Sequence, residues 1–270
     1  MNYKFSANHR LSVNLRMRLG IKTAWNALKD IQVSPKATSN AFAFVVGCGH
    51  SGNTLIAARL GNMKEVFVIP RETKIFSPQN SLRDAQRIIS GWDEAATERG
   101  MNWVIEKTPK HVHCWRRIRT ILPFAKFIVA TRNPLDTCAS LKNRFGNLDL
   151  AIERYVMDNE AALELLEAGG VFHVSYENFV LNPELVGKQI LEFLGLPWSN
   201  ALITGGTSAY DNRGVPTNLQ KPHSQKRRSQ VKGPIVPRID TWKNLISEAE
   251  AASVRRATSA VADRLGITSS

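Results

Sequence analysis

The sequence predicts an α/β protein in which a central parallel β-sheet is covered by helices on both faces. Two observations carry this prediction. Short apolar runs alternate with helical segments from residue 41 onward, in the order that builds parallel strands joined by crossover helices. The runs 42–46 and 127–131 are almost entirely apolar, as expected for strands that are buried on both faces.

The strands are predicted from apolar runs, and two of the helix starts from a capping residue followed by proline. Thr108 with Pro109, and Asn133 with Pro134, combine a capping residue with proline at the first helical position. Asp136 then stands at the third position of the second of these helices. The expected strands are 42–46, 66–69, 103–106, 127–131 and 171–174, and the expected helices are 54–61, 81–99, those starting at Thr108 and Asn133, 149–168, 184–194 and 240–264.

Two basic segments interrupt or precede this alternation. Residues 1–40 contain seven Lys or Arg and a single acid, Asp30, and we expect a basic helical extension whose apolar stripe packs on the core or contacts a membrane surface. Residues 34–39 resemble a linker, so that 41–270 form one domain. The segment 197–237 is rich in proline and basic residues, which predicts a long loop that is functional or disordered.

Composition limits the function. The 270 residues carry 36 Lys and Arg against 23 acids, a net charge of +13, which favours an anionic partner such as a nucleotide, nucleic acid, an anionic membrane or an acidic polymer. The cysteines at 48, 114 and 138 lack CxxC spacing, so we expect neither a disulfide framework nor a zinc site. With no signal-peptide pattern and no apolar run near the ~20 residues of a spanning helix, we expect a cytoplasmic protein.

The segment GCGHSGNT, residues 47–54, has the spacing of a phosphate-cradling loop between a strand and a helix. Its glycines let backbone N–H groups approach an anion, and Ser51 and Thr54 add hydroxyl donors. We therefore expect a nucleotide-binding fold of the P-loop-containing type, the alternative being an ordinary glycine-rich turn. Asn53, however, occupies the position where triphosphate-binding loops have Lys.

A second loop follows strand 127–131 and starts with Arg132, whose guanidinium suits a phosphate. Ser140 lies four residues after Asp136, on the same face of the predicted helix. A triphosphate-dependent kinase would need an Asp at such a strand end to hold magnesium. A kinase with a degenerate loop is therefore an alternative, as is a non-catalytic nucleic-acid-binding protein that uses residues 213–238 and the basic N-terminus.

Taken together, these residues resemble the sulfotransferase family that uses 3′-phosphoadenosine 5′-phosphosulfate (PAPS), in its bacterial type and closest in pattern to carbohydrate and tyrosyl-protein sulfotransferases. The resemblance runs from about residue 42 to 243. It implies that the loop holds the 5′-phosphosulfate, that Arg132 and Ser140 bind the 3′-phosphate, and that a late basic segment also grips the nucleotide. The implied cofactor-binding residues are Gly49, His50, Ser51, Gly52, Asn53, Thr54, Arg132, Ser140, Arg228, Ser229 and Lys232.

Two further stretches resemble active-site segments of that family. Residues 70–76 are similar to the segment that supplies a catalytic Glu, and residues 106–109 to a strand end whose Lys faces the transferred group. The resemblance implies that Glu72 is the base, that Lys107 stabilises charge and that His50 serves the leaving phosphate, with no metal required. For Glu72, the alternative is a surface carboxylate paired with Arg71 or Lys74.

His50 departs from the pattern, because most relatives have Arg or Lys at that position. An imidazole can do the same work only while it is protonated. The setting of Glu72 suggests a glycan or glycolipid acceptor, and nucleic acid is not expected as a partner. The implied activity is the transfer of SO₃ from PAPS to a hydroxyl or amine by in-line displacement.

Overall fold

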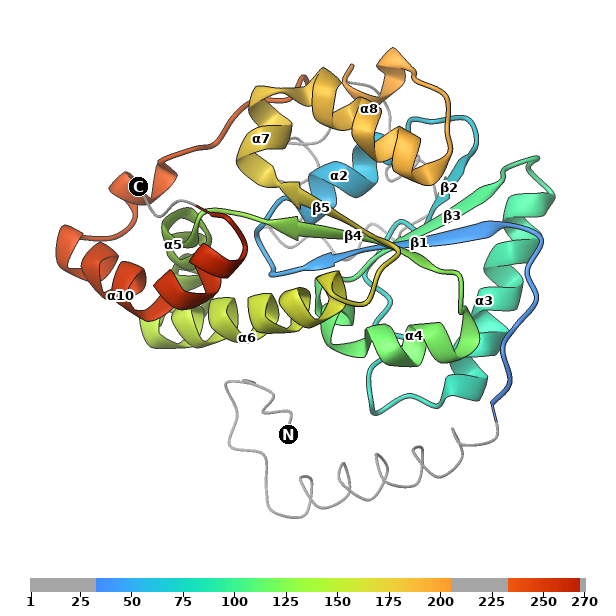
Figure 1. Cartoon of the computed structure of the whole chain (residues 1–270), viewed down its shortest axis with the longest axis horizontal. Coiled ribbons are helices and arrows are strands. Elements are labelled where there is room, and N and C mark those ends of the chain that lie inside the picture. The colour runs from blue at the N-terminus through green and yellow to red at the C-terminus, as the bar shows by residue number, and fades with distance from the viewer. Residues whose placement is uncertain (1–32, 205–232, 268–270) are drawn as a thin grey trace, which may run out of the picture.

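The computed structural model describes residues 33–204 and 233–267, which fold around one five-stranded sheet (Figure 1). The strand order is β2-β3-β1-β4-β5 and every pairing is parallel, which confirms the predicted fold class. The carboxyl ends of all five strands therefore lie along one edge of the sheet. The strands are β1 (Ala41–Gly47), β2 (Val66–Val68), β3 (Trp103–Lys107), β4 (Lys126–Thr131) and β5 (Val171–Ser175).

Helices cover both faces of the sheet, as the apolar strands require. Alternate residues of β1 point to opposite sides: Ala43 and Val45 join one core, while Phe42, Phe44 and Val46 join the other. The first core is covered by α2 (Asn53–Leu60), α7 (Tyr176–Leu181) and α8 (Pro183–Leu194) (Figure 1). The second is covered by α3 (Leu82–Thr97), α4 (Trp115–Ile121) and α6 (Leu148–Leu166).

A third apolar cluster lies beyond the end of the sheet. There α5 (Pro134–Phe145) and α10 (Glu248–Arg264) pack against α6 (Figure 1). Trp242 is buried in the same cluster. The cluster supports the loops that follow β1 and β4, because it includes both Cys48 and Leu135.

The predicted helix starts are correct in one case and wrong in another. Asn133 caps α5, since its side chain accepts from the Leu135 N–H at 2.8 Å. The segment after Thr108 instead begins as the 3₁₀ helix η1 (Pro109–Cys114), and the Thr108 hydroxyl makes no capping bond. That hydroxyl is 2.5 Å from the Glu106 carboxylate, to which it donates, because the buried acid needs a donor more than the helix end does.

The ends of the domain also differ from the prediction. The expected helix 240–264 is broken into η3 (Thr241–Asn244) and α10, because Ser247 forms a capping box with Glu250 that starts a new helix. Helix α7 was not predicted. The short 3₁₀ helix η2 (Asn200–Leu202) lies within the predicted loop 197–237.

Some predictions fall outside the described residues. These are the basic helix within residues 1–32 and the contacts expected from Arg228, Ser229 and Lys232. Residues 33–38 have no regular structure, as expected for a linker. Asn40 fixes the start of β1, because its backbone N–H donates to the Asp93 carboxylate at 2.9 Å.

A fully buried arginine of α2 holds two distant points of the chain together. Arg59 donates to the carbonyl oxygen of Thr204 at 2.7 Å and to that of Gly233 at 2.5 Å. Burial lowers the pKa of its guanidinium. The helix that follows the phosphate loop therefore also fixes both ends of the segment 205–232.

Candidate active site

The loop between β1 and α2 is shaped by two glycines that no other residue can replace. Gly47 has φ 131°, and a Cβ there would lie 2.3 Å from the carbonyl oxygen of Ala130 on β4. Gly52 has φ 87°, and a Cβ there would lie 2.7 Å from the ring of Tyr176. The loop backbone is therefore pressed against β4 on one side and against α7 on the other.

The loop presents hydrogen-bond donors that suit an anion. Gly52 is the N-cap residue of α2 and offers no side-chain cap, while the first N–H groups of a helix have no intrahelical acceptor. The Ser51 hydroxyl is completely buried and has no hydrogen-bond partner among the described residues. A bound phosphate or sulfate oxygen would satisfy these donors, which supports the predicted role of the loop.

Asn53 and Thr54 begin α2 and differ in how they face the loop. The Asn53 side chain is buried, and its amide donates to the Cys48 carbonyl at 2.8 Å, so it closes the loop from within. Its side chain therefore shapes the loop, and its backbone N–H is the group at the helix start. Thr54 is half-buried at the next position.

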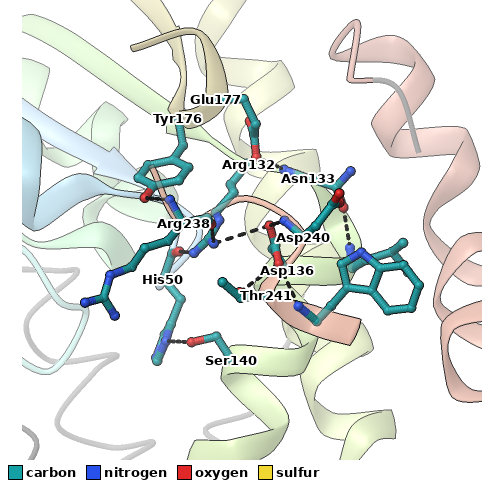
Figure 2. A network of polar contacts seen from close by, with 12 residues as sticks. His50, Arg132, Asn133, Asp136, Ser140, Tyr176, Glu177, Arg238, Asp240 and Thr241 are labelled. Atoms are coloured by element: carbon teal, nitrogen blue, oxygen red, sulfur yellow. Dashed lines mark hydrogen bonds and ion pairs between the residues drawn. The ribbon is translucent and has the colours of Figure 1, made fainter. Parts of the chain in front are cut away.

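His50 connects the loop to α5. It has a left-handed backbone with φ 71°, and its Nδ1 lies 2.6 Å from Oγ of Ser140 (Figure 2). The family resemblance implies that these two side chains serve different phosphates of one nucleotide. The structure brings them into direct contact, so a substitution of Ser140 should change the position of the His50 imidazole.

Arg132 follows β4 and is almost buried beneath the loop. Its guanidinium donates to the backbone carbonyl of His50 at 3.2 Å and to that of Arg238 (Figure 2). It also lies 3.4 Å from the Asp136 carboxylate and 4.5 Å above the ring of Tyr176. The predicted phosphate-binding arginine is thus held in one orientation from several sides.

Asp136 has a role that sequence analysis missed. Its carboxylate accepts hydrogen bonds from the Asp240 N–H at 3.0 Å, from the Thr241 hydroxyl at 2.9 Å and from the Trp242 N–H at 2.9 Å (Figure 2). It thereby fixes the chain before α10 to the first turn of α5. The sequence shows that Asp136 lies in the first turn of a helix. It does not show that the partners of this carboxylate lie about a hundred residues later in the chain.

Tyr176 is a second residue that sequence analysis missed. Besides contacting Gly52 and Arg132, its hydroxyl accepts from the Arg238 N–H at 3.2 Å. It lies at the start of α7, directly after β5, so the carboxyl end of a fourth strand also reaches the site.

Glu72 and Lys107 form an ion pair at the carboxyl end of β3. Nζ of Lys107 lies 2.9 Å from Oε1 of Glu72. The lysine side chain is 3% exposed and the glutamate 36% exposed, so the pair can be approached from the glutamate side.

A buried network holds the segment that carries Glu72. The Glu106 carboxylate accepts from the Thr73 hydroxyl at 2.9 Å and the Thr108 hydroxyl at 2.5 Å, and it lies 3.0 Å from Nδ1 of His111. Burial alone would raise the pKa of Glu106, but His111 and the hydroxyl donors outweigh it and lower the pKa. The segment 106–109 was predicted to matter through Lys107, and no role was predicted for Glu106.

Comparisons with known proteins bear on the family and the fold. The model of the sulfotransferase family matches residues 90–200, from α3 through β3, α5 and α6 to η2. This match bears out the predicted resemblance to the sulfotransferase family over these residues. A comparison with curated protein sequences finds no match.

Solved structures share the sulfotransferase fold at low identity. The sulfotransferase domain of the Synechococcus PCC 7002 olefin synthase is 18% identical, with a TM-score of 0.61, and the match covers 87% of this chain and 98% of that one. A Mycobacterium avium sulfotransferase is 14% identical, with a TM-score of 0.53 and coverages of 94% and 82%. A mouse sulfotransferase crystallised with PAP is 13% identical, with a TM-score of 0.52 and coverages of 90% and 91%.

Two further observations concern other kinds of site. Within residues 33–204 and 233–267, no three His, Cys, Asp or Glu side chains are grouped so that they could hold a metal ion. In the same residues, no helix is long and apolar enough to cross a membrane.

Proposed function

We propose that this sulfotransferase-family protein transfers SO₃ from PAPS to a hydroxyl or amine of an acceptor, and that the acceptor is a glycan or glycolipid. The observation that carries the proposal is the convergence of three strand ends. The phosphate loop follows β1, the Glu72–Lys107 pair lies at the end of β3, and Arg132 follows β4. Since β1 is paired in parallel with both β3 and β4, these groups follow neighbouring strand ends along one edge of the sheet.

The described residues fit a bisphosphorylated nucleotide. The loop donors and the orphaned Ser51 hydroxyl suit the 5′-phosphosulfate, and Arg132 with Ser140 suits the 3′-phosphate. The mouse relative was crystallised with PAP, the product that remains after SO₃ has left PAPS. The strand that would carry a metal-binding Asp in a kinase ends in Thr131 and is followed by Arg132 instead, which favours a phosphosulfate over a magnesium triphosphate.

Three side chains supply the chemistry. Glu72 takes the proton from the acceptor O–H or N–H while the new O–S or N–S bond forms. Lys107 balances the charge that spreads over the sulfuryl oxygens. The S–O bond to the 5′-phosphate breaks in line, and His50 offers a hydrogen bond or proton to the phosphate oxygen that leaves. Ser140, at 2.6 Å, orients this imidazole.

The proposal is tested first by binding and then by turnover. PAP should bind without magnesium, whereas stabilisation by ATP with magnesium but not by PAP would point to a kinase. Incubation with ³⁵S-labelled PAPS and a panel of glycans and glycolipids should then label an acceptor. Binding of random duplex DNA in the absence of any nucleotide binding would overturn the proposal in favour of a nucleic-acid-binding protein.

A further inference from the structure

A second arginine, Arg154, lies close to the phosphate loop. Arg154, on α6, donates from Nε to the Asp158 carboxylate, whose other oxygen lies 2.6 Å from Nε2 of His113. Asp158 is 1% exposed, while the Arg154 and His113 side chains remain 19% and 16% exposed. The buried carboxylate thus fixes one edge of the Arg154 guanidinium and leaves the residue in contact with solvent.

The other edge of this guanidinium faces the loop. A Cβ built on Gly49 would lie 4.0 Å from an Nη atom of Arg154. The neighbouring Cys48 is completely buried; burial, and secondly the Asp158 carboxylate, raise the pKa of its thiol. Arg154 therefore stands beside the Gly49 turn, whereas Arg132 is bonded to the carbonyl of the next residue, His50.

Further cations gather at this point. Lys110, three residues after Lys107, is half-buried in η1, which packs against α6. Burial lowers the pKa of Lys110, and so do the charges of Arg154, Lys74 and Arg144, while only Asp158 acts in the opposite direction. An anion bound beside these cations would be stabilised by their charges.

We propose that Arg154 and Lys110 form a subsite for an anionic substituent of the acceptor, such as a sulfate, carboxylate or phosphate group close to the accepting hydroxyl. This inference rests on the proposed function. The donor nucleotide already has its own partners in the loop, Arg132 and Ser140. Lys110 and Lys74 come from the segments that carry Lys107 and Glu72, the groups that face the acceptor. The subsite therefore adds selectivity for an acceptor that is already charged.

The experiment measures acceptor-side binding with the donor site filled. The full chain is saturated with PAP, and isothermal titration gives the Kd of a sulfated disaccharide and of its unsulfated counterpart. A parallel arm compares vesicles of phosphatidylglycerol with vesicles of phosphatidylcholine. The variants are Arg154→Gln and Lys110→Gln. Arg87→Gln is the matched control, because Arg87 is an exposed cation on α3 outside the site.

The expected result is a ratio of affinities. The wild type and the Arg87 variant should bind the sulfated sugar at least about tenfold more tightly than the neutral one, and each subsite variant should reduce this ratio to about one or two. The Kd of PAP should stay within about twofold, since neither residue is assigned to the nucleotide. The same pattern with vesicles alone would also support the subsite and would identify a lipid headgroup as the source of the anion.

Two results would overturn the inference. In the first, Arg154→Gln changes neither the preference for the sulfated over the unsulfated disaccharide nor the preference for phosphatidylglycerol over phosphatidylcholine vesicles. In the second, Arg154→Gln weakens PAP binding as strongly as it weakens the sulfated sugar, which would assign the residue to the donor. Failure of the wild type to bind PAP at all would instead refute the proposed function, so the two failures are distinguishable.

Discussion

The guanidinium of Arg132 donates a hydrogen bond to the backbone carbonyl of His50 over 3.2 Å, which ties the end of β4 to the phosphate loop. A side chain that would bind one phosphate thus shapes the loop that would bind the other. Removing the guanidinium should therefore affect both halves of a nucleotide site.

Arg132→Ala should weaken PAP binding by about 10- to 100-fold, because one charge-assisted contact is lost and the loop loses a restraint. Isothermal titration measures the effect, and circular dichroism checks the fold. Arg132→Lys keeps the positive charge but lacks the planar guanidinium. Its affinity for PAP should therefore lie between those of the wild type and Arg132→Ala. Unchanged PAP affinity in the folded Ala variant would refute the assignment.

Glu72→Gln should lower kcat by about 10²- to 10⁴-fold, since the amide cannot accept the acceptor proton. The Kd of PAP should stay within about twofold, because Glu72 contacts Lys107 and lies at β3 rather than at the loop. Labelled-sulfate transfer and PAP titration measure the two quantities separately. Arg71→Gln is a neighbouring control, and equal loss of activity there would argue against a specific role for Glu72.

His50→Lys should extend activity to higher pH. An imidazole loses its charge within the physiological range, whereas a lysine keeps its charge beyond it. The pH dependence of kcat under saturating PAPS is the measurement. Ser140→Ala removes the 2.6 Å partner and should lower activity without extending it to higher pH. Identical alkaline limits in the wild type and the Lys variant would show that His50 acts only through its backbone.

Glu106→Gln should reduce stability in a pH-dependent way. The pKa of Glu106 is lowered in the folded protein, so the folded state binds its proton less readily than the unfolded state. Its contribution is therefore full above the ordinary value of 4.5 and is lost as pH falls through the lower folded value. Urea unfolding should show a loss of about 1–3 kcal/mol for the variant at pH 7.

The pH dependence supplies the control for this prediction. The difference in unfolding free energy between wild type and Glu106→Gln should shrink as the pH is lowered from 5 to 3, about the range over which such a carboxyl gains its proton. Glu164→Gln, on the exposed face of α6, should leave both the stability and its pH dependence unchanged. A difference that stays constant with pH would mean that packing, not charge, makes Glu106 important.

Much of the fold could be predicted because its signals are local. The apolar runs of β1 and β4 are strands that are buried on both faces, and Asn133 with Pro134 marks a helix start by its own chemistry. The loop 47–54 was recognisable for the same reason, since its glycine spacing lies within one short segment. Its position beside Arg132 followed from the rule that parallel strands end at one edge.

The remaining features depend on partners that are distant in sequence. Asp136 binds the backbone near Trp242, and Tyr176 packs on Gly52, yet no local pattern relates these pairs. The same holds for Thr108, because its hydroxyl donates to the buried carboxylate of Glu106 instead of capping the helix. The pairing of Glu72 with Lys107 likewise joins residues that are 35 positions apart in the sequence.

Arg59 has a consequence for how such a protein can diversify. Because one guanidinium bonds to the carbonyls of Thr204 and Gly233, the two anchor points stay together whatever sequence joins them. Closing a loop between fixed points becomes only about 0.6 kcal/mol costlier each time its length doubles. Residues 205–232 can therefore be lengthened, shortened or exchanged between relatives at little thermodynamic penalty, and chimeras joined at these two residues should retain the parent melting temperature.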